Sequence, residues 1–390
     1  MIGLKHYYLK IKARGSFSDS LKSGSWQEWN GSEKLISNHS YTNGVANGIW
    51  EDYFENGMLQ QKGAYSMDKK QGKWESYFAN GNIKSTAHYK DGLKDGSSSI
   101  WFANKTVAEE GNYSKGKKEG SWKWFLEDGK VDMEGTFKDN KQDGPWRYHY
   151  KSEHQVLSQG NFKNDLRNGK WEFFYVDGNK WKVGHYTKGK KDSLWNTFHE
   201  NGTLLIQGNY KMGLEEGKWY TNYSDGQKQD EGNYVKGKMD GKWQGWYSNQ
   251  KPRYEGYYVN GEKNGLWMYW NDRGTKELEE TSANGILEGM RKSWHPNGKL
   301  RDEGFYKNDK QDGLWIFYHE NGKKAMEATY KEGRINGKVT TWYEFGAIES
   351  EKNYQEGLPH GTFTFYGKRE GEIKKILKFK NGLRISKADN

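Results

Sequence analysis

Aromatic residues return along this chain at a fixed interval, separated by glycines and charged residues. The segment 72–81, Gly-Lys-Trp-Glu-Ser-Tyr-Phe-Ala-Asn-Gly, recurs with few changes at 48–57 and 313–322. With the Trp of each segment as position 0, successive zero positions are 24 residues apart, except for one interval of 25. The zero positions are Trp26, Trp50, Trp74, Ser98, Trp122, Trp146, Trp171, Trp195, Trp219, Trp243, Trp267, Arg291, Trp315, Val339 and Phe363. A constant period is typical of a repeat array rather than of independent domains.

Two turn signals divide each repeat. Positions +6 and +7 are often Asn-Gly or Asp-Gly, as in Asn80-Gly81, and such pairs favour a two-residue type I′ hairpin turn. Position +18 is Gly, Asn or Asp, which indicates a second, looser turn. The segments between the turns are rich in Trp, Tyr and Phe, which favour strands. Each repeat is therefore predicted to run strand, tight turn, strand, looser turn.

The glycines predict how the strands pair. Gly occupies most −2 and +13 positions, and Tyr or Phe most +15 positions. A two-residue turn at +6/+7 places Trp 0 opposite Gly +13, and Tyr +15 opposite Gly −2, within a repeat and again towards the next one. Rings that cover glycine backbone stabilise sheets. We expect two columns on one face, Trp-Gly and Tyr-Gly, in which Trp74 lies between Ala87 and Gly63.

The predicted fold is all-β, an elongated single-layer antiparallel meander of about sixteen 24-residue β-hairpin repeats, forming a twisted or superhelical ribbon. We treat 1–390 as one repeat domain: a partial repeat in 1–25 with Ile2 at position 0, regular repeats in 26–362, and a C-terminal repeat and tail in 363–390.

Three places depart from the pattern. Ser98 replaces a Trp, and the stretch 148–159 lacks the Asn-Gly pair and holds the extra residue, which predicts a longer loop or a bulge. After Trp267 the repeat has Glu280 at +13 and Ser282 at +15, and the next zero position is Arg291. This third place is a candidate for a bend, a functional interruption or decay of the repeat.

Position +3 is also aromatic and falls on the opposite face by strand alternation. Its rings either pack within a twisted ribbon or form a binding surface. The candidate partner-binding residues are Trp101, Trp246, Trp270, Trp294, Tyr318 and Trp342.

The combined pattern Gly-x-Trp-x-x-Tyr-x-x-Asn-Gly, then Gly-x-Tyr-x-x-Gly-x-x-x-Gly, resembles MORN repeats, in particular the bacterial variant of YwqK-type antitoxin proteins. The resemblance extends from Phe17 to about Phe379. It implies a scaffold, and in the antitoxin case an immunity protein that neutralises a co-encoded toxin. It offers no catalytic residues.

Candidate chemistry is sparse. The chain has no Cys, and it lacks the phosphate-binding, zinc-protease and serine-hydrolase motifs. His199, His295 and His319 share position +4 with Phe and Tyr, which indicates an aromatic slot rather than a metal site. Carboxylates recur near the second turn, as in Asp95 and Glu119, and are interpreted as exposed ion pairs. We therefore expect no enzyme, metal, cofactor or small-molecule substrate.

Charge leaves a second function open. The net charge is +10, with Lys pairs such as Lys69-Lys70, Lys117-Lys118 and Lys190-Lys191. The primary expectation is a scaffold that binds a protein partner; the alternative is a ribbon associated with a membrane surface or with a polyanion such as nucleic acid. No apolar run is long enough to span a membrane as a helix, and residues 1–11 do not resemble a signal peptide. We expect a cytoplasmic protein, or an envelope or secreted one if a leader was removed.

Overall fold

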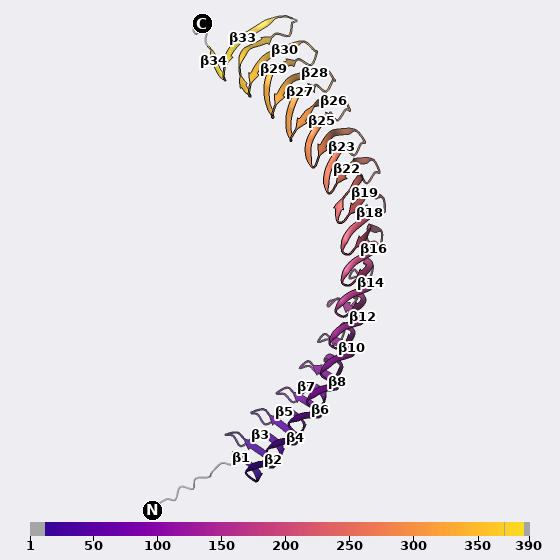
Figure 1. The fold of residues 1–390 in the computed structure, drawn as a ribbon, viewed down its shortest axis with the longest axis vertical. Coiled ribbons are helices and arrows are strands. Elements are labelled where there is room, and N and C mark those ends of the chain that lie inside the picture. Colours follow the sequence, from indigo (N-terminus) through magenta and orange to yellow (C-terminus); the bar gives the residue numbers. More distant parts are fainter. Residues whose placement is uncertain (1–11, 370, 386–390) are drawn as a thin grey trace, which may run out of the picture. The chain divides into compact units, whose positions relative to one another are not determined.

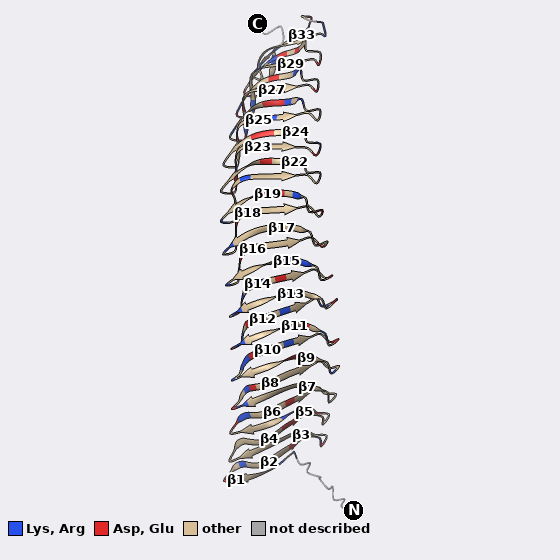
Figure 2. Ribbon diagram, turned by 90° about the vertical axis from the view of Figure 1, so that its right-hand side faces the viewer, with Lys and Arg blue, Asp and Glu red and all other residues tan. Residues whose placement is uncertain are grey.

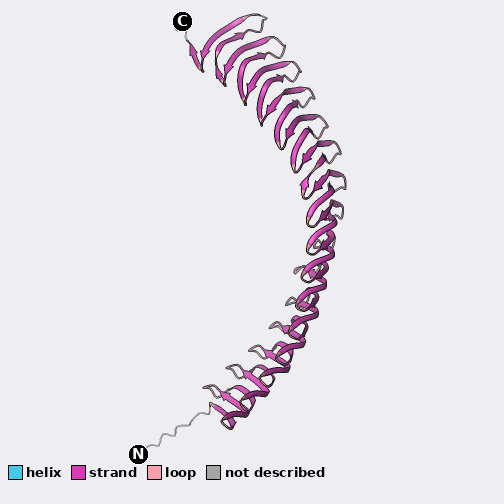
Figure 3. Ribbon diagram, viewed as in Figure 1, coloured by secondary structure: helices cyan, strands magenta, loops and turns pink. Residues whose placement is uncertain are grey.

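The computed structural model describes residues 12–369 and 371–385, and the chain divides into two compact units, residues 1–191 (unit 1) and 192–390 (unit 2). The predicted zero position at Ile2 lies outside the described residues, as does the end of the predicted tail. The regular structure of the described residues is β-strand (Figure 3). No helix of the described part is long and apolar enough to cross a membrane.

Unit 1 is a single layer of hairpins in which each strand pairs antiparallel with its neighbours along the chain (Figure 1). Its strands are β1 (Ala13–Ser18), β2 (Leu21–Trp29), β3 (Leu35–Thr42), β4 (Val45–Tyr53), β5 (Leu59–Ser66), β6 (Lys69–Tyr77), β7 (Ile83–Lys90), β8 (Leu93–Trp101), β9 (Val107–Ser114), β10 (Lys117–Phe125), β11 (Val131–Lys138), β12 (Lys141–His149), β13 (Val156–Lys163), β14 (Leu166–Phe174) and β15 (Lys180–Thr187). The division between the units falls within β16 (Lys190–Phe198).

Unit 2 repeats the same antiparallel arrangement. Its strands are β17 (Leu204–Lys211), β18 (Leu214–Asn222), β19 (Lys228–Val235), β20 (Lys238–Met239), β21 (Gly241–Trp246), β22 (Pro252–Val259), β23 (Glu262–Trp270), β24 (Lys276–Ala283), β25 (Ile286–Trp294), β26 (Leu300–Lys307), β27 (Lys310–Tyr318), β28 (Lys324–Lys331), β29 (Arg334–Trp342), β30 (Ile348–Gln355), β31 (Leu358–Pro359), β32 (Gly361–Tyr366), β33 (Ile373–Lys380) and β34 (Leu383–Ile385). The predicted all-β, single-layer antiparallel meander is confirmed.

The two turns are exchanged relative to the prediction. The two-residue type I′ turn lies at +17/+18, where Asp91 (φ 52°) and Gly92 (φ 87°) both take positive φ angles. At the other end, Gly81 N–H donates to the Phe78 carbonyl over 2.9 Å, and Gly81 alone of the Asn80-Gly81 pair has positive φ. That turn is a type I turn followed by a left-handed Gly. Its longer loop and one bulged residue after it offset each other, so Trp74 still pairs with Ala87 and Gly72 with Tyr89.

The glycine at −2 has a different role from the predicted one. Between β7 and β8 the register shifts, so Tyr89 faces Lys94, at −4 of the next repeat, instead of Gly96 at −2. Gly96 has φ +108° within this bulge. A Cβ added to Gly72, which has φ +69°, would have no neighbouring atom within 4 Å, so no ring covers this glycine. The left-handed backbone of the bulge, rather than an overlying ring, explains the −2 glycine. The predicted Tyr-Gly column therefore fails between repeats.

The glycine at +13 has the predicted role. A Cβ on Gly63 would lie 2.3 Å from the ring of Trp74, the Trp of the following repeat. The indole N–H of Trp74 donates to the carbonyl of Ala64 over 3.1 Å, and Trp122 repeats this bond with Asn112. Each such indole lies flat on the preceding strand and bonds to a carbonyl beside its bulge. This is how a single-layer sheet buries Trp122 and Trp171 to within 1% of full burial.

Carboxylates at −3 connect each type I′ turn to the next one and are not the solvated ion-pair ladder that we expected. The Glu119 carboxylate accepts the backbone N–H of Asp139 over 3.0 Å, at the first position of the next type I′ turn. Glu216 accepts the corresponding N–H of Lys236 over 2.9 Å. The second turn residue also bonds back, as Gly92 N–H does to the Lys70 carbonyl over 3.0 Å. Each type I′ turn is thereby held by the strand that follows the preceding type I′ turn.

Candidate interaction faces

The sheet of each unit has two chemically different faces. The tryptophan face carries positions 0, +13, +15 and −4. The charged face carries positions −1, +1, +3, +12 and +14, because side chains alternate along a strand. The hydroxyl of Tyr77, at +3, donates to Glu75, at +1, over 2.8 Å, which places the +3 row on the charged face as predicted.

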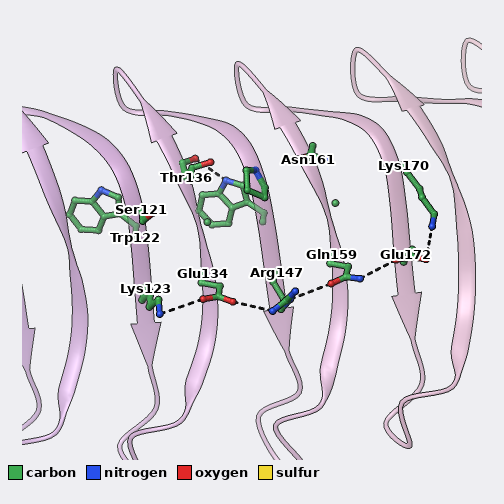
Figure 4. A pocket seen from close by; sticks show the side chains of 14 residues that line it. Ser121, Trp122, Lys123, Glu134, Thr136, Arg147, Gln159, Asn161, Lys170 and Glu172 are labelled. Atoms are coloured by element: carbon green, nitrogen blue, oxygen red, sulfur yellow. Dashed lines mark hydrogen bonds and ion pairs between the residues drawn. The ribbon is translucent and has the colours of Figure 1, made fainter.

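In unit 1 the charged face holds a linked set of side chains above a shallow depression of about 440 Å³ (Figure 4). The links run from Lys123 to Glu134, Arg147, Gln159 and Glu172. The Arg147 guanidinium lies 3.5 Å from Glu134 and donates to Gln159 over 3.2 Å. Since the cations and carboxylates neutralise one another, this depression offers no strong charge to a ligand.

Two carboxylates on this face have strongly lowered pKa values. Lys170, 2.8 Å away, together with Gln159 and Lys180, lowers the pKa of Glu172 to about 2. Lys73, 2.6 Å away, together with Lys62, lowers the pKa of Glu75 to about 2. Both groups are held ionised by their neighbours, as in a structural ladder.

In unit 2 the charged face carries a glutamate at +12 in six consecutive repeats. These are Glu231, Glu255, Glu279, Glu303, Glu327 and Glu351, and each pairs with a Lys. Glu303, for example, lies 3.1 Å from Lys292 and accepts the Tyr318 hydroxyl over 2.9 Å. The Tyr318 pKa rises to about 12 because of burial and the Glu303 charge.

Five of the six candidate partner-binding residues lie in one row of unit 2. Trp246, Trp270, Trp294, Tyr318 and Trp342 end strands β21, β23, β25, β27 and β29, and all are half-buried.

Lysines cover part of this row, for example Lys276 Nζ at 5.3 Å from the Trp294 ring and Lys324 Nζ at 5.6 Å from Trp342. Trp101 is also half-buried, but it ends β8 of unit 1. Each side chain of the row is therefore partly packed against its neighbours and partly exposed to solvent.

A more exposed set of apolar side chains lies beside this row and was missed in the sequence. The apolar stripe consists of Tyr257, Leu266, Met290, Phe305 and Leu314, at positions −1 and +14 of strands β22 to β27, each 43–52% exposed. Met290 pairs directly with Phe305, and Thr281 lies between Leu266 and Met290. The signal was available, because −1 is apolar in Leu266, Met290 and Leu314 in succession.

A second missed feature lies on the tryptophan face of unit 1. Here −4 carries a cation in most repeats. The cation row consists of Lys22, Lys70, Lys94, Lys118, Arg167 and Lys191. Lys70 Nζ lies 3.8 Å from the Trp74 ring centroid, and Lys118 Nζ lies 3.8 Å from that of Trp122. The predicted Lys pairs are therefore split: Lys70 and Lys118 lie over rings rather than at loop tips.

In the repeat after Trp267, the third irregular place, charged side chains replace the missing Trp-Gly contact. Glu280 pairs with Arg291 in the strand register, and the Lys263 ammonium lies 3.3 Å from Glu280. The Arg291 guanidinium lies 2.9 Å from Asp302, which also accepts the Ser293 hydroxyl. The ladder continues through this repeat, so the interruption affects side-chain chemistry rather than strand pairing.

The other irregular loop and the +4 histidines are structural. In the long loop, Tyr150 N–H donates to Gln155 over 2.8 Å and His154 takes a φ of 59°, which confirms the predicted longer connection. His295 Nε2 lies 2.9 Å from the carbonyl oxygen of Tyr318. In another repeat, the Tyr247 hydroxyl at the same +4 position donates to the carbonyl of Trp270 over 2.8 Å. Imidazole and phenol make the same bond to the next repeat. The described residues contain no group of three potential metal ligands.

Separate segments of the chain are similar to a repeat-family model. No curated protein matches the chain. Among solved structures, TcdB2-TccC3 without its hypervariable C-terminal region matches at 12% identity over 92% of this chain and 20% of its own, with a TM-score of 0.16. The Photorhabdus luminescens Tc holotoxin pore matches at 12% identity over 87% of this chain and 19% of its own, also with a TM-score of 0.16. The chain spans about a fifth of these proteins, and TM-scores this low do not establish a common fold.

A family model described as "MORN repeat variant" matches separate segments of the chain, each beginning at position −4. The segments are 46–66, 70–91, 118–139, 191–212, 287–308, 311–332 and 335–356. Each covers one hairpin from the residue before the bulge to the type I′ turn. Seven hairpins of this chain match the MORN repeat variant.

Proposed function

We propose that the protein is a non-catalytic scaffold that binds a partner protein through the charged face of unit 2. The observation that supports this most is the apolar stripe. Five large apolar side chains stand exposed on neighbouring strands, over roughly 25 Å at the strand spacing of a sheet. Contiguous exposed apolar side chains are typical of interaction sites, and single ones are not.

The surroundings of the stripe fit a protein partner. On one side lie the paired glutamates and lysines, and beyond them the Trp246 to Trp342 row with rings half-buried. An apolar centre flanked by polar groups, with Trp and Tyr side chains nearby, is the usual composition of a protein interface. The stripe would supply the buried centre and the glutamate ladder the rim.

The test compares capture of partners by the full chain and by two matched variants. Phe305→Ser with Leu314→Ser removes the centre of the stripe, and Ser121→Ala with Thr136→Ala alters the same positions in unit 1. A partner captured by the wild type and the unit 1 variant, but lost with the stripe variant at unchanged thermal stability, supports the proposal. Equal capture by all three proteins, or self-association that the stripe variant abolishes, contradicts it.

Neutralisation of a toxin is a finer proposal that rests on the YwqK-type resemblance alone. Co-expression with the product of a neighbouring gene would test it: restored growth of the host supports an antitoxin, and unrelieved toxicity contradicts it. We also propose a cytoplasmic location for the protein.

A polyanion or membrane surface is the second candidate function, favoured by the net charge and the cation row. Its binding to DNA or anionic vesicles would weaken steeply as salt rises from low to moderate concentration. Binding that does not change with salt argues against it.

A further inference from the structure

The cation row forms an alternating series with tyrosine and phenylalanine rings. Tyr89 pairs with Lys94 in the strand register, and Lys70 Nζ also lies over Tyr89, at 5.3 Å. Tyr113 pairs with Lys118, and Lys94 Nζ lies over Tyr113 at 4.7 Å. From β6 to β10 the order is therefore Lys70, Tyr89, Lys94, Tyr113, Lys118.

Little negative charge balances this series. Lys70 and Lys94 form no ion pair in the described part of the chain, whereas lysines of the charged face, such as Lys73, are paired. Lys118 lies 3.5 Å from Glu109, and Asp52 acts on Lys70 from farther away. Lys70 is half-buried, and burial with the nearby Lys94 charge lowers its pKa. The row thus holds like charges close together at a cost that an anion would relieve.

The spacing of the row selects the anion. Consecutive −4 residues are two strands apart, or about 9.4–9.8 Å. In a polyproline II helix, with about 3.1 Å per residue and three residues per turn, every third side chain returns to one face after about 9.3 Å. Acidic side chains at every third position would meet successive cations, and prolines between them would lie over the half-buried Tyr89 and Tyr113.

We propose that the tryptophan face of unit 1 binds an extended acidic polypeptide in the polyproline II conformation, with an acidic residue at every third position aligned on Lys70, Lys94 and Lys118. Figure 2 shows Lys and Arg on the strands that carry this row. Sheet twist limits the match to a few turns of the peptide, so the three consecutive cations are the centre of the site. This site is separate from the apolar stripe and does not depend on it.

The natural sequence supplies tolerated substitutions for the test. At the −4 position unit 2 carries Met239, Leu287 and Ile335, so an apolar side chain fits beside the bulge. The test variant is Lys70→Met with Lys94→Met and Lys118→Met in the full chain. The control removes the same charge from the charged face, as Lys73→Met with Lys123→Met and Lys170→Met.

The probes are fluorescent peptides titrated at low salt. One contains six Glu-Pro-Pro triplets, and the other six Glu-Pro-Pro-Pro quartets with the same charge but a different spacing. The triplet peptide should bind about tenfold tighter than the quartet peptide, and the test variant should lose about tenfold in triplet affinity, while the control variant should keep it.

Equal affinity for the two peptides overturns the spacing argument, and unchanged triplet binding by the test variant overturns the site. A single-stranded oligonucleotide and phosphatidylserine vesicles form two further arms. If either binds tighter than the triplet peptide, and only the test variant loses it, the row is a phosphate-binding site and the peptide proposal is wrong.

Discussion

The two units are built from the same hairpins and differ at positions whose residue type the hairpin geometry does not constrain. At −4, unit 1 places Lys70, Lys94 and Lys118 over aromatic rings, whereas unit 2 has Glu215 and Met239. In unit 2, Lys263 at −4 lies 4.7 Å from the Trp267 ring centroid, and it is paired with Glu280.

The opposite face differs in the reverse sense. Between β10 and β13 of unit 1, the −1 and +14 positions carry Ser121, Thr136, Pro145 and Asn161, which line a depression. Unit 2 has exposed Met290 and Phe305 at the same positions. One unit therefore presents charge on its tryptophan face and the other presents apolar surface on its charged face. Two binding chemistries can share one backbone because the bulge, the turns and the Trp-Gly contact constrain neither set of positions.

The largest expected effect concerns the tryptophans at position 0, one from each unit. Trp171 is fully buried and donates to the Asn161 carbonyl over 2.9 Å, whereas Trp219 is half-buried and its indole nitrogen is without a hydrogen-bond partner. Trp171→Ala should destabilise unit 1 by about 3–5 kcal/mol, and Trp219→Ala should destabilise unit 2 by about 2 kcal/mol. Hydrogen exchange of the flanking strands measures each locally. Equal losses would show that neither the deeper burial of Trp171 nor its indole hydrogen bond adds stability.

The next effect concerns the charged rung of unit 2. Arg291→Trp alone should destabilise by about 1–3 kcal/mol, because the new ring would meet the Glu280 side chain and Asp302 would lose one of its two guanidinium partners, keeping only Arg301. Adding Glu280→Gly restores the Trp-Gly contact and should recover at least half of that loss. A double-mutant cycle on thermal unfolding gives the coupling. If the free-energy changes of the two substitutions are additive, a Trp-Gly contact at this place requires more than these two positions.

The sequence predicted the parts of the fold that depend on one contact and missed those that depend on backbone geometry. The +13 glycine was interpreted correctly, because a ring over Gly63 requires only size complementarity. The −2 glycine was misinterpreted, because nothing local in the sequence distinguishes a glycine under a ring from one with positive φ, as in Gly96. The type I′ turn was misplaced because Met67-Asp68 adopts it without any Gly.

The candidate site was predicted in part. The +3 row was placed on the correct face, but the stripe beside it was not, since exposure depends on which neighbours fail to cover a side chain. Asp95 and Glu119 looked like surface charge because their partners, backbone N–H groups, lie 20 residues away in the next turn.

A smaller effect separates the carboxylates of unit 1 from ordinary surface charge. Since its neighbours lower the pKa of Glu172 to about 2, this group stabilises the fold fully above its usual pKa near 4.5 and loses that contribution as pH falls towards 2. With allowance for solvent screening, the loss should be about 1 kcal/mol. Glu172→Gln should flatten the stability of unit 1 between about pH 4.5 and pH 2, and Glu153→Gln in an exposed loop should not. An unchanged slope in Glu172→Gln would contradict the assignment.

The smallest effect exchanges the −4 residues of the two units. A lysine over an aromatic ring contributes about 0.5–1 kcal/mol, and a methionine at the same place gains a similar amount from apolar contact. Lys70→Met in unit 1 and Met239→Lys in unit 2 should therefore each change the free energy of unfolding by less than about 1 kcal/mol, measured by chemical denaturation. A loss well above that from Lys70→Met would show that the cation holds the Trp74 rung in place. In that case the row of cations in unit 1 would be part of the fold, and the difference between the units would be one of stability rather than of binding.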